Sequence, residues 1–186
     1  MRTSPPGLRP LARHSLSRAL AAAVLLLAGG GCGSKDEPAE KGPSLPAGVS
    51  ALGADARIAM PAPERPACQP APTRKVFRMD AEWNGLWEFG FPEGCPRPQL
   101  PAGFDWNREM IVLASMGRRA SSADSIEVQG SGVVGDSVLV VIRRTTRADG
   151  CTEPKVRTWP RDLVRIPADK RPVRFIEEHR KLPCPE

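Results

Sequence analysis

The sequence predicts a mainly β domain of the α+β class, an antiparallel sheet or sandwich with one short helix near its N-terminal end. Two observations carry this prediction. Between residues 104 and 176, short runs rich in β-branched residues alternate with turn residues, which is typical of consecutive strands. No connection between these runs is long enough for the crossover helix of a βαβ unit, so we expect mainly antiparallel pairing.

The predicted globular domain covers residues 73–186 and begins with a strand at residues 76–79. Asp80 follows at the position of a helix N-cap. Three apolar residues then repeat at the spacing of one helix face: Trp83, Leu86 and Trp87. We expect this face to pack onto the sheet, because paired tryptophans form core contacts far more often than ligand platforms.

Five further strands are predicted along the rest of the domain. Residues 110–116 and 138–142 are apolar on both faces, which favours central positions in a sheet. Residues 126–128 place two apolar side chains on one face, and Pro160 marks an edge or a bulge. The last two runs close the sheet, at residues 163–166 and 173–176.

The net charge argues against a nucleic-acid partner. The 186 residues carry a formal charge of +6, but residues 1–31 contain four arginines and no acidic residue, and subtracting these arginines leaves +2. The rest of the chain therefore lacks the basic surface that nucleic-acid binding requires.

Residues 1–31 have the layout of an export signal, with a basic start, an apolar core at residues 19–28 and a small-residue region. The core is shorter than the roughly 20 residues of a membrane-spanning helix. Residues 27–32, Leu-Ala-Gly-Gly-Gly-Cys, resemble a bacterial lipoprotein box, in which the cysteine is lipidated. We expect a lipid anchor on Cys32 and a location in the cell envelope, outside the cytoplasm; the alternative is cleavage near Ala28 and a free thiol.

The other cysteines form an even set: Cys68, Cys95, Cys151 and Cys184. In an exported protein, such a set predicts two disulfides. No Cys-x-x-Cys pair is present, so we expect no structural zinc or other metal site. Three pairings are possible, and we favour Cys68–Cys184 across the ends of the domain with Cys95–Cys151 between two loops.

Residues 32–72 are rich in proline and show no apolar period, which predicts a flexible or polyproline-like tether. Two short apolar stretches, residues 51–53 and 58–60, allow the alternative that part of this segment docks onto the domain.

The sequence contains no recognisable catalytic constellation. His179 is the only histidine outside the signal and lies near a C-terminus that we expect to fray, with no nucleophile in an elbow motif. Asp105 and Glu109 flank the start of a strand, where turn chemistry accounts for the aspartate. We therefore expect a protein without enzymatic activity and without a cofactor.

Four arginines in two connections form the candidate contact surface: Arg118, Arg119, Arg143 and Arg144. Arginine is favoured at protein interfaces because its planar guanidinium can bind a carboxylate through two hydrogen bonds. The alternative is that these side chains only make the protein soluble.

Several positions resemble the C-terminal domain of PrcB, a family of protease-complex subunits. The resemblance covers residues 75–177 and rests on these elements: the helix segment 82–87, the Asp-aromatic pair 105–106, the β-run ending at Gly117, the Ile-x-Val strand 126–128, the Thr-x-Pro segment 158–160 and the strand 163–166. The chain has Ser-Ala-Asp at residues 122–124, where the family usually has Gly-Gly-Tyr.

The resemblance implies an exported, often lipid-anchored protein, in some cases accessory to a surface protease complex, with no activity of its own established. We therefore expect a non-enzymatic interaction module that binds a protein partner and reaches the membrane through its lipid. Two alternatives are a loop-based protease inhibitor acting through the turn between Gly117 and Ile126, and a structural envelope lipoprotein.

Overall fold

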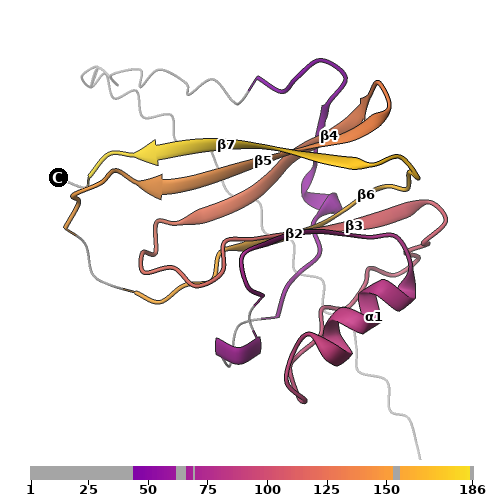
Figure 1. Cartoon of the computed structure of the whole chain (residues 1–186), viewed down its shortest axis with the longest axis horizontal. Coiled ribbons are helices and arrows are strands. Elements are labelled where there is room, and N and C mark those ends of the chain that lie inside the picture. Colours follow the sequence, from indigo (N-terminus) through magenta and orange to yellow (C-terminus); the bar gives the residue numbers. More distant parts are fainter. Residues whose placement is uncertain (1–43, 62–65, 69, 153–155, 185–186) are drawn as a thin grey trace, which may run out of the picture. The chain divides into compact units, whose positions relative to one another are not determined.

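Two β-sheets are stacked on each other in the computed structural model, which describes residues 44–61, 66–68, 70–152 and 156–184 (Figure 1). One α-helix lies on the outer side of the second sheet, so the predicted β-rich α+β class is confirmed. The described elements follow in chain order: β1 (Ser50–Ala51), η1 (Ala54–Ala56), η2 (Pro66–Cys68), β2 (Thr73–Phe77), α1 (Asp80–Phe89), β3 (Glu109–Ser115), β4 (Ser125–Val134), β5 (Ser137–Arg147), β6 (Arg161–Pro167) and β7 (Val173–Leu182).

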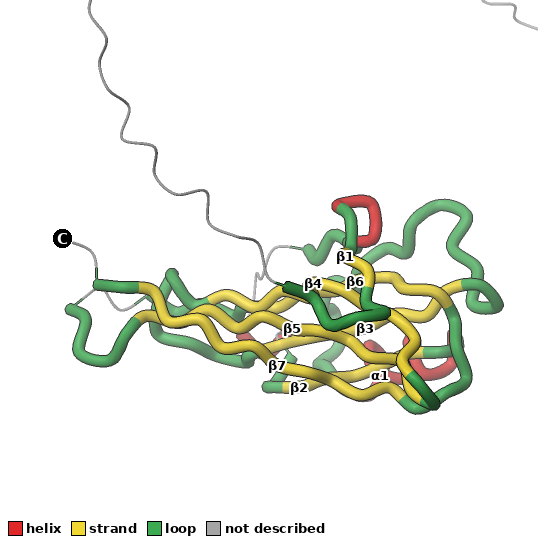
Figure 2. The backbone as a smooth tube through the Cα atoms, turned by 90° about the horizontal axis from the view of Figure 1, so that it is seen from above, coloured by secondary structure: helices red, strands yellow, loops and turns green. Residues whose placement is uncertain are grey.

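The larger sheet has the order β1-β4-β5-β7, and Figure 2 shows β4, β5 and β7 side by side. β4 pairs antiparallel with β5, as predicted, and also with β1. β5 and β7, however, pair parallel from Val138↔Val173 to Arg147↔Leu182. The expectation of mainly antiparallel pairing is confirmed by the other strand pairs. This pair is the exception, because the chain returns through β6 of the other sheet and so needs no crossover helix.

The smaller sheet has the order β2-β3-β6, and β3 pairs antiparallel with both neighbours. This confirms the predicted central position of the run that begins at Met110. Met110, Val112 and Ala114 pack between the two sheets, whereas Ile111 and Leu113 pack toward α1. All five side chains are buried, because β3 has a hydrophobic layer on each face.

Helix α1 covers the second face of this sheet through the predicted apolar stripe. Trp83 is fully buried, and its ring contacts Phe77 of β2 edge to face with centroids 5.3 Å apart. The helix start differs from the expectation, since Met79 is the N-cap residue and Asp80 is the first helical residue. Glu82 accepts a hydrogen bond from the backbone N–H of Arg78 at 2.7 Å and so satisfies a donor at the helix start.

Residues 44–61 pack against the sheets, so the folded part begins before residue 73 and the docking alternative holds for this stretch. β1 pairs with β4, and the N–H of Ile58 donates to the carbonyl of Leu163 at 2.8 Å. Ile58 is buried in the cluster beneath α1. The chain crosses β4 so closely that a Cβ on Gly132 would lie 2.0 Å from the carbonyl oxygen of Gly48. The export signal and Cys32 lie outside the described residues.

A buried carboxylate joins this N-terminal segment to both sheets. Asp162 of β6 accepts a hydrogen bond from the backbone N–H of Val128 in β4 at 2.8 Å and another from Arg57. Arg57 also pairs with Glu127 of β4. Burial by itself would lower the pKa of Arg57, but the hydrogen bonds and charges of Asp162 and Glu127 raise it above its ordinary value.

The four cysteines form two disulfides, as predicted, but the favoured pairing is wrong: the bonds are Cys68–Cys95 and Cys151–Cys184. Cys151 follows β5 and Cys184 follows β7, and these neighbouring parallel strands end side by side. The pairing thus follows from the parallel register. Paired cysteines of this kind are typical of proteins that fold in an oxidising compartment outside the cytoplasm.

Within the described ranges, the structure has no helix with the length and apolar character needed to span a membrane.

Candidate interaction groove

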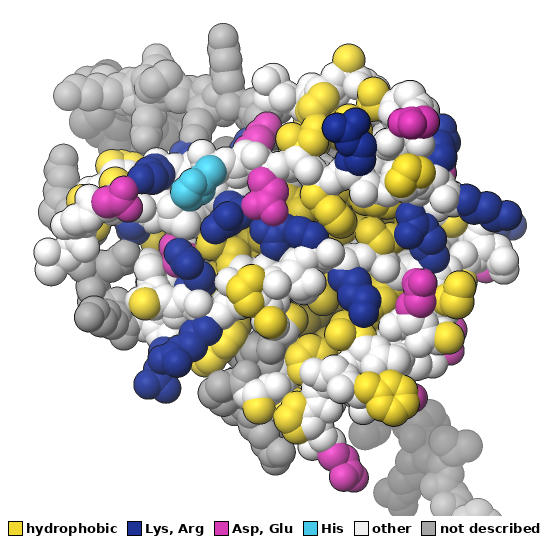
Figure 3. Space-filling model, viewed as in Figure 1, with side chains coloured by type: hydrophobic (Ala, Val, Ile, Leu, Met, Phe, Trp, Pro, Cys, Tyr) yellow, Lys and Arg dark blue, Asp and Glu magenta, His cyan; other side chains and the backbone are white. Residues whose placement is uncertain are grey.

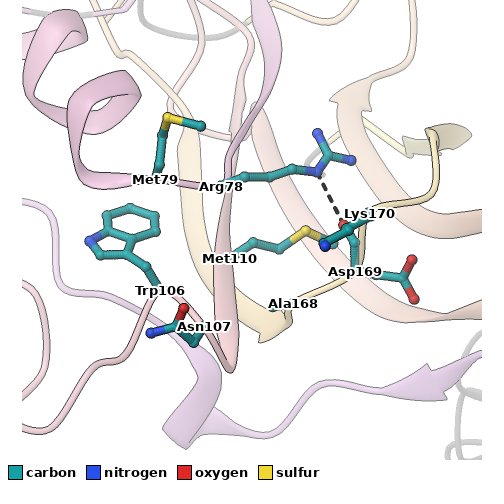
Figure 4. Close-up of a pocket in the computed structure, with 8 residues that line it drawn as sticks. All are labelled: Arg78, Met79, Trp106, Asn107, Met110, Ala168, Asp169 and Lys170. Carbon is teal, nitrogen blue, oxygen red and sulfur yellow. Dashed lines mark hydrogen bonds between the residues drawn. The ribbon is translucent and has the colours of Figure 1, made fainter.

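One end of the sandwich carries a groove of about 540 Å³. It forms where three segments meet: the end of β2, the turn before β3, and the connection between β6 and β7. Its lining residues are Arg78, Met79, Trp106, Asn107, Met110, Ala168, Asp169 and Lys170 (Figure 4).

The turn before β3 holds one wall of the groove. The carboxylate of Asp105 accepts hydrogen bonds from the backbone N–H of Asn107 at 2.9 Å and from its side chain at 3.0 Å. These hydrogen bonds lower the pKa of Asp105 and keep it ionised. The N–H of Ala168 donates to the carbonyl of Arg108 at 2.8 Å, which ties the turn to the β6–β7 connection. Trp106 is therefore held at a fixed place in the wall.

Arg78 holds the opposite wall. Its Nε donates to the carbonyl of Asp169 at 3.1 Å, and its Nη2 donates to the carbonyl of Arg171 at 2.9 Å. The side chain and backbone N–H of Arg171 bind the carboxylate of Asp169, and together with the charge of Arg78 they lower its pKa to about 2. The β6–β7 connection is thus fixed by Arg78, which follows β2, and by Arg171 within the connection itself.

The groove combines an apolar surface with a positive rim. Met79 is 53% exposed, Met110 is buried at the floor, and Trp106 is half-buried across from Lys170 (Figure 4). Lys170 is exposed and has no hydrogen bond or ion pair with any described residue. An exposed apolar surface with a polar rim is typical of an interaction site. This arrangement suits a segment that carries an apolar side chain next to a carboxylate.

A second hollow of about 600 Å³ shares Asp169 with the groove. It lies between the segment around β1, the tip of the β4–β5 hairpin and the end of β6, and its apolar lining residues are Leu52, Val133, Val138, Ile166 and Pro167. Val133 is 45% exposed. The two hollows at this end of the sandwich therefore meet at a charged side chain, Asp169.

The structure only partly gathers the predicted arginine surface. Arg118 and Arg119 line a hollow of about 430 Å³ at the opposite end of β3, together with Thr146 and Arg147. Arg119 is not free, because its Nε binds the buried carboxylate of Asp124 at 2.7 Å. Of this predicted set, Arg118 remains exposed and without a partner among the described residues.

The other two predicted arginines are engaged within the larger sheet. Successive residues of a strand point to opposite faces of the sheet, so the side chains of Arg143 and Arg144 lie on opposite faces. Arg143 pairs with Glu178 at 3.4 Å, and Arg144 pairs with Glu177 at 3.5 Å. In the view of Figure 3, basic and acidic side chains are interspersed and do not gather into one basic patch.

The residues weighed as catalytic have structural contacts. His179 lies within β7 and not in a frayed end, since this strand continues to Leu182, and its Nε2 is 2.8 Å from the hydroxyl of Thr146. Glu109 binds Arg165 at 3.0 Å, apart from the turn contacts of Asp105. In the described part of the chain, no three His, Cys, Asp or Glu side chains are placed to hold a metal ion.

Sequence reasoning did not find Met79, Trp106 or Lys170 as neighbours. They come from three segments that are far apart in the chain, and no spacing rule links them.

Comparison with protein-family models, with curated proteins and with solved structures finds no match to this chain.

Replacing Arg171 with Ala should raise the pKa of Asp169 from about 2 toward its ordinary value of 3.8. A carboxyl group with a lowered pKa stabilises the folded state at pH values above its ordinary pKa. This contribution is lost as the pH falls through about 2. The contribution of Asp169 to stability should therefore be fully present above about pH 4. An NMR titration of the carboxyl carbon measures both values, and an unchanged midpoint in Arg171→Ala would contradict the assignment. Arg108→Ala is the matched control and should leave Asp169 unchanged.

Proposed function

We propose that this chain is an exported lipoprotein anchored through Cys32. The proposal is supported by the basic start, the short apolar core and the small residues before this cysteine. The two disulfides agree with it, because they use all the cysteines except Cys32 and are typical of an oxidising compartment. The folded unit begins within residues 44–61, so roughly a dozen residues separate the proposed lipid from the domain.

We infer that the domain is a non-enzymatic interaction module that binds a protein partner, in keeping with the resemblance to the accessory PrcB family. The observation that carries this proposal is the groove between β2, β3 and the β6–β7 connection. Its walls are fixed by Asp105 and Arg78, while Met79 and Lys170 are left exposed. A rigid frame around adaptable apolar and basic groups is suited to recognition of a partner.

The partner segment that fits this groove carries an apolar side chain beside an acidic one. The apolar side chain would lie against Met79 and Trp106. The rim favours a carboxylate, since two lining residues, Arg78 and Lys170, are basic and one, Asp169, is acidic. A complementary charge would also speed association and make it dependent on salt.

Replacing Cys32 with Ser should move the protein from the membrane fraction to the soluble fraction. Lipidation requires the thiol, and serine offers none. Intact mass spectrometry of the wild-type protein extracted from membranes should give a chain that starts at Cys32 and carries acyl groups. A mature mass without acyl groups, or equal membrane binding by the Cys32→Ser variant, would contradict the anchor. Cys32→Ser also leaves the four disulfide cysteines unchanged, so the fold serves as an internal control.

A photoreactive amino acid at position 79 should cross-link to one discrete protein in intact envelopes, and Lys170→Glu should remove that adduct. The same group at Phe89, which is 87% exposed and outside the groove, is the matched control and should not give this adduct. An adduct that persists with Lys170→Glu, or that forms equally from position 89, would contradict the groove as the binding site. Inhibition of a purified protease by the wild-type chain would instead favour the inhibitor alternative.

A further inference from the structure

The free edge of β7 is the longest open edge among the described strands. β7 is ten residues long and forms the end of the β1-β4-β5-β7 sheet, and β5 is its one hydrogen-bonded neighbour in the part of the chain that the structure describes. The edge of β6, by contrast, is covered by residues 57 and 58, which bond to Val164 and Leu163. An uncovered edge offers a row of backbone donors and acceptors to another strand.

The backbone contacts show which residues of β7 face this edge. Val138 N–H donates to the carbonyl of Pro172, and Ala148 N–H donates to the carbonyl of Leu182. The register is continuous between these two points, so the even-numbered residues bond to β5. The N–H and C=O of the odd-numbered residues therefore point to the open edge, including those of Glu177, His179 and Lys181.

The side chains of this strand form a self-complementary series. Residues 176–182 read Ile-Glu-Glu-His-Arg-Lys-Leu, with two acids before His179, two bases after it, and one apolar residue at each end. An antiparallel copy centred on His179 places acid opposite base at every charged position. The pairs, each of which occurs twice, are Ile176 with Leu182, Glu177 with Lys181 and Glu178 with Arg180.

The sequence series and the backbone directions select the same register. With His179 at the centre, the odd residues that point to the open edge form the hydrogen-bonded pairs of an antiparallel ladder. The two residues of each pair are both odd-numbered or both even-numbered, so their side chains lie on the same face of the joined sheet. Phe175, Glu177 and His179 face the sandwich, as their contacts with the core, Arg74 and Thr146 show. Glu178 faces outward with Arg143.

The fold leaves space for this arrangement. Glu177 lies 2.7 Å from Arg74 near the start of β2, so the rest of β7 extends beyond the first residues of the smaller sheet. Figure 1 shows β5 and β7 continuing past the other sheet toward the C-terminus. A second copy can therefore meet this half of β7 without meeting the smaller sheet of the first. The disulfide between Cys151 and Cys184 fixes the ends of the overhanging strands.

We propose that the chain forms a symmetric dimer in which β7 of one copy pairs antiparallel with β7 of a second copy around His179. The two larger sheets then join into one continuous sheet. The twofold axis runs perpendicular to this sheet, so the interface is isologous and closes at two copies. This inference is independent of the groove and of the lipid anchor, since no residue of either takes part.

A charge exchange tests the register. Glu178→Arg and Arg180→Glu should each weaken the dimer at least about tenfold, because each creates two facing pairs of like charge. The double variant Glu178→Arg with Arg180→Glu should restore the dimer, since every facing pair is again opposite in charge. Sedimentation equilibrium of the full chain in detergent measures the dissociation constants, and circular dichroism checks that each variant is folded. A wild-type monomer up to about 100 µM, or a double variant no tighter than the single ones, overturns the proposal.

A cysteine pair tests the same register without changing its charges. His179→Cys should give a disulfide-linked dimer, because facing Cα atoms in a hydrogen-bonded antiparallel pair are about 5.5 Å apart. Phe175→Cys is the matched control on the same face, and its two copies would be about 27 Å apart in this register. Equal cross-linking of both variants, or none by His179→Cys, overturns the proposal.

Discussion

The carboxylate of Asp162 is the contact on which the rest of the structure depends. It lies on β6, is 9% exposed, and binds both a backbone N–H of β4 and the guanidinium of Arg57. Removing one partner from a buried charge leaves an uncompensated group, which is costly in the interior of a protein. The two sheets and the N-terminal segment must therefore come together around this one group. Its bond to Val128 also lies next to the point where the β4–β5 register shifts.

This contact joins the sheets on one side of the sandwich, and on the opposite side they are joined by an ion pair and by hydrogen bonds from an arginine to backbone carbonyls. There, Arg74 reaches Glu177 and Arg78 reaches the β6–β7 connection. These links hold the sheets together without covering the edge of β7 or filling the end of the sandwich. The two surfaces proposed for recognition, the groove and the β7 edge, thus lie on the side of the sandwich opposite Asp162.

The strands with strong apolar patterns were predictable from the sequence, and so was the α1 stripe. Residues 110–116 are buried on both faces, and such a run has few alternatives to a central strand. The parallel pairing of β7 was not predictable, because the period of two is the same in parallel and antiparallel strands. The error in the disulfide pairing followed directly, since Cys151 and Cys184 meet only when β5 and β7 run in the same direction.

The candidate site was predictable only in its chemistry. The sequence drew attention to arginines in loops, yet Arg119, Arg143 and Arg144 proved to have carboxylate partners. Met79, Trp106 and Lys170 lie together only through the packing of three distant segments. The second half of β7 was missed because its charged residues conceal the alternation of a strand at an edge. Once the direction of the strand was known, the order of these charges around His179 indicated a register for pairing with a second copy.

Amide hydrogen exchange of the full chain with Asp162→Ala tests the central role of this carboxylate most directly. The account predicts that the amides of Val128 and Ile58 lose protection together, by at least about tenfold, because both depend on the segments that Asp162 joins. Asp55→Ala, which removes a carboxylate whose side chain is 85% exposed on the same N-terminal segment, should leave both amides protected. Unchanged protection at Val128 and Ile58 in Asp162→Ala would contradict the account.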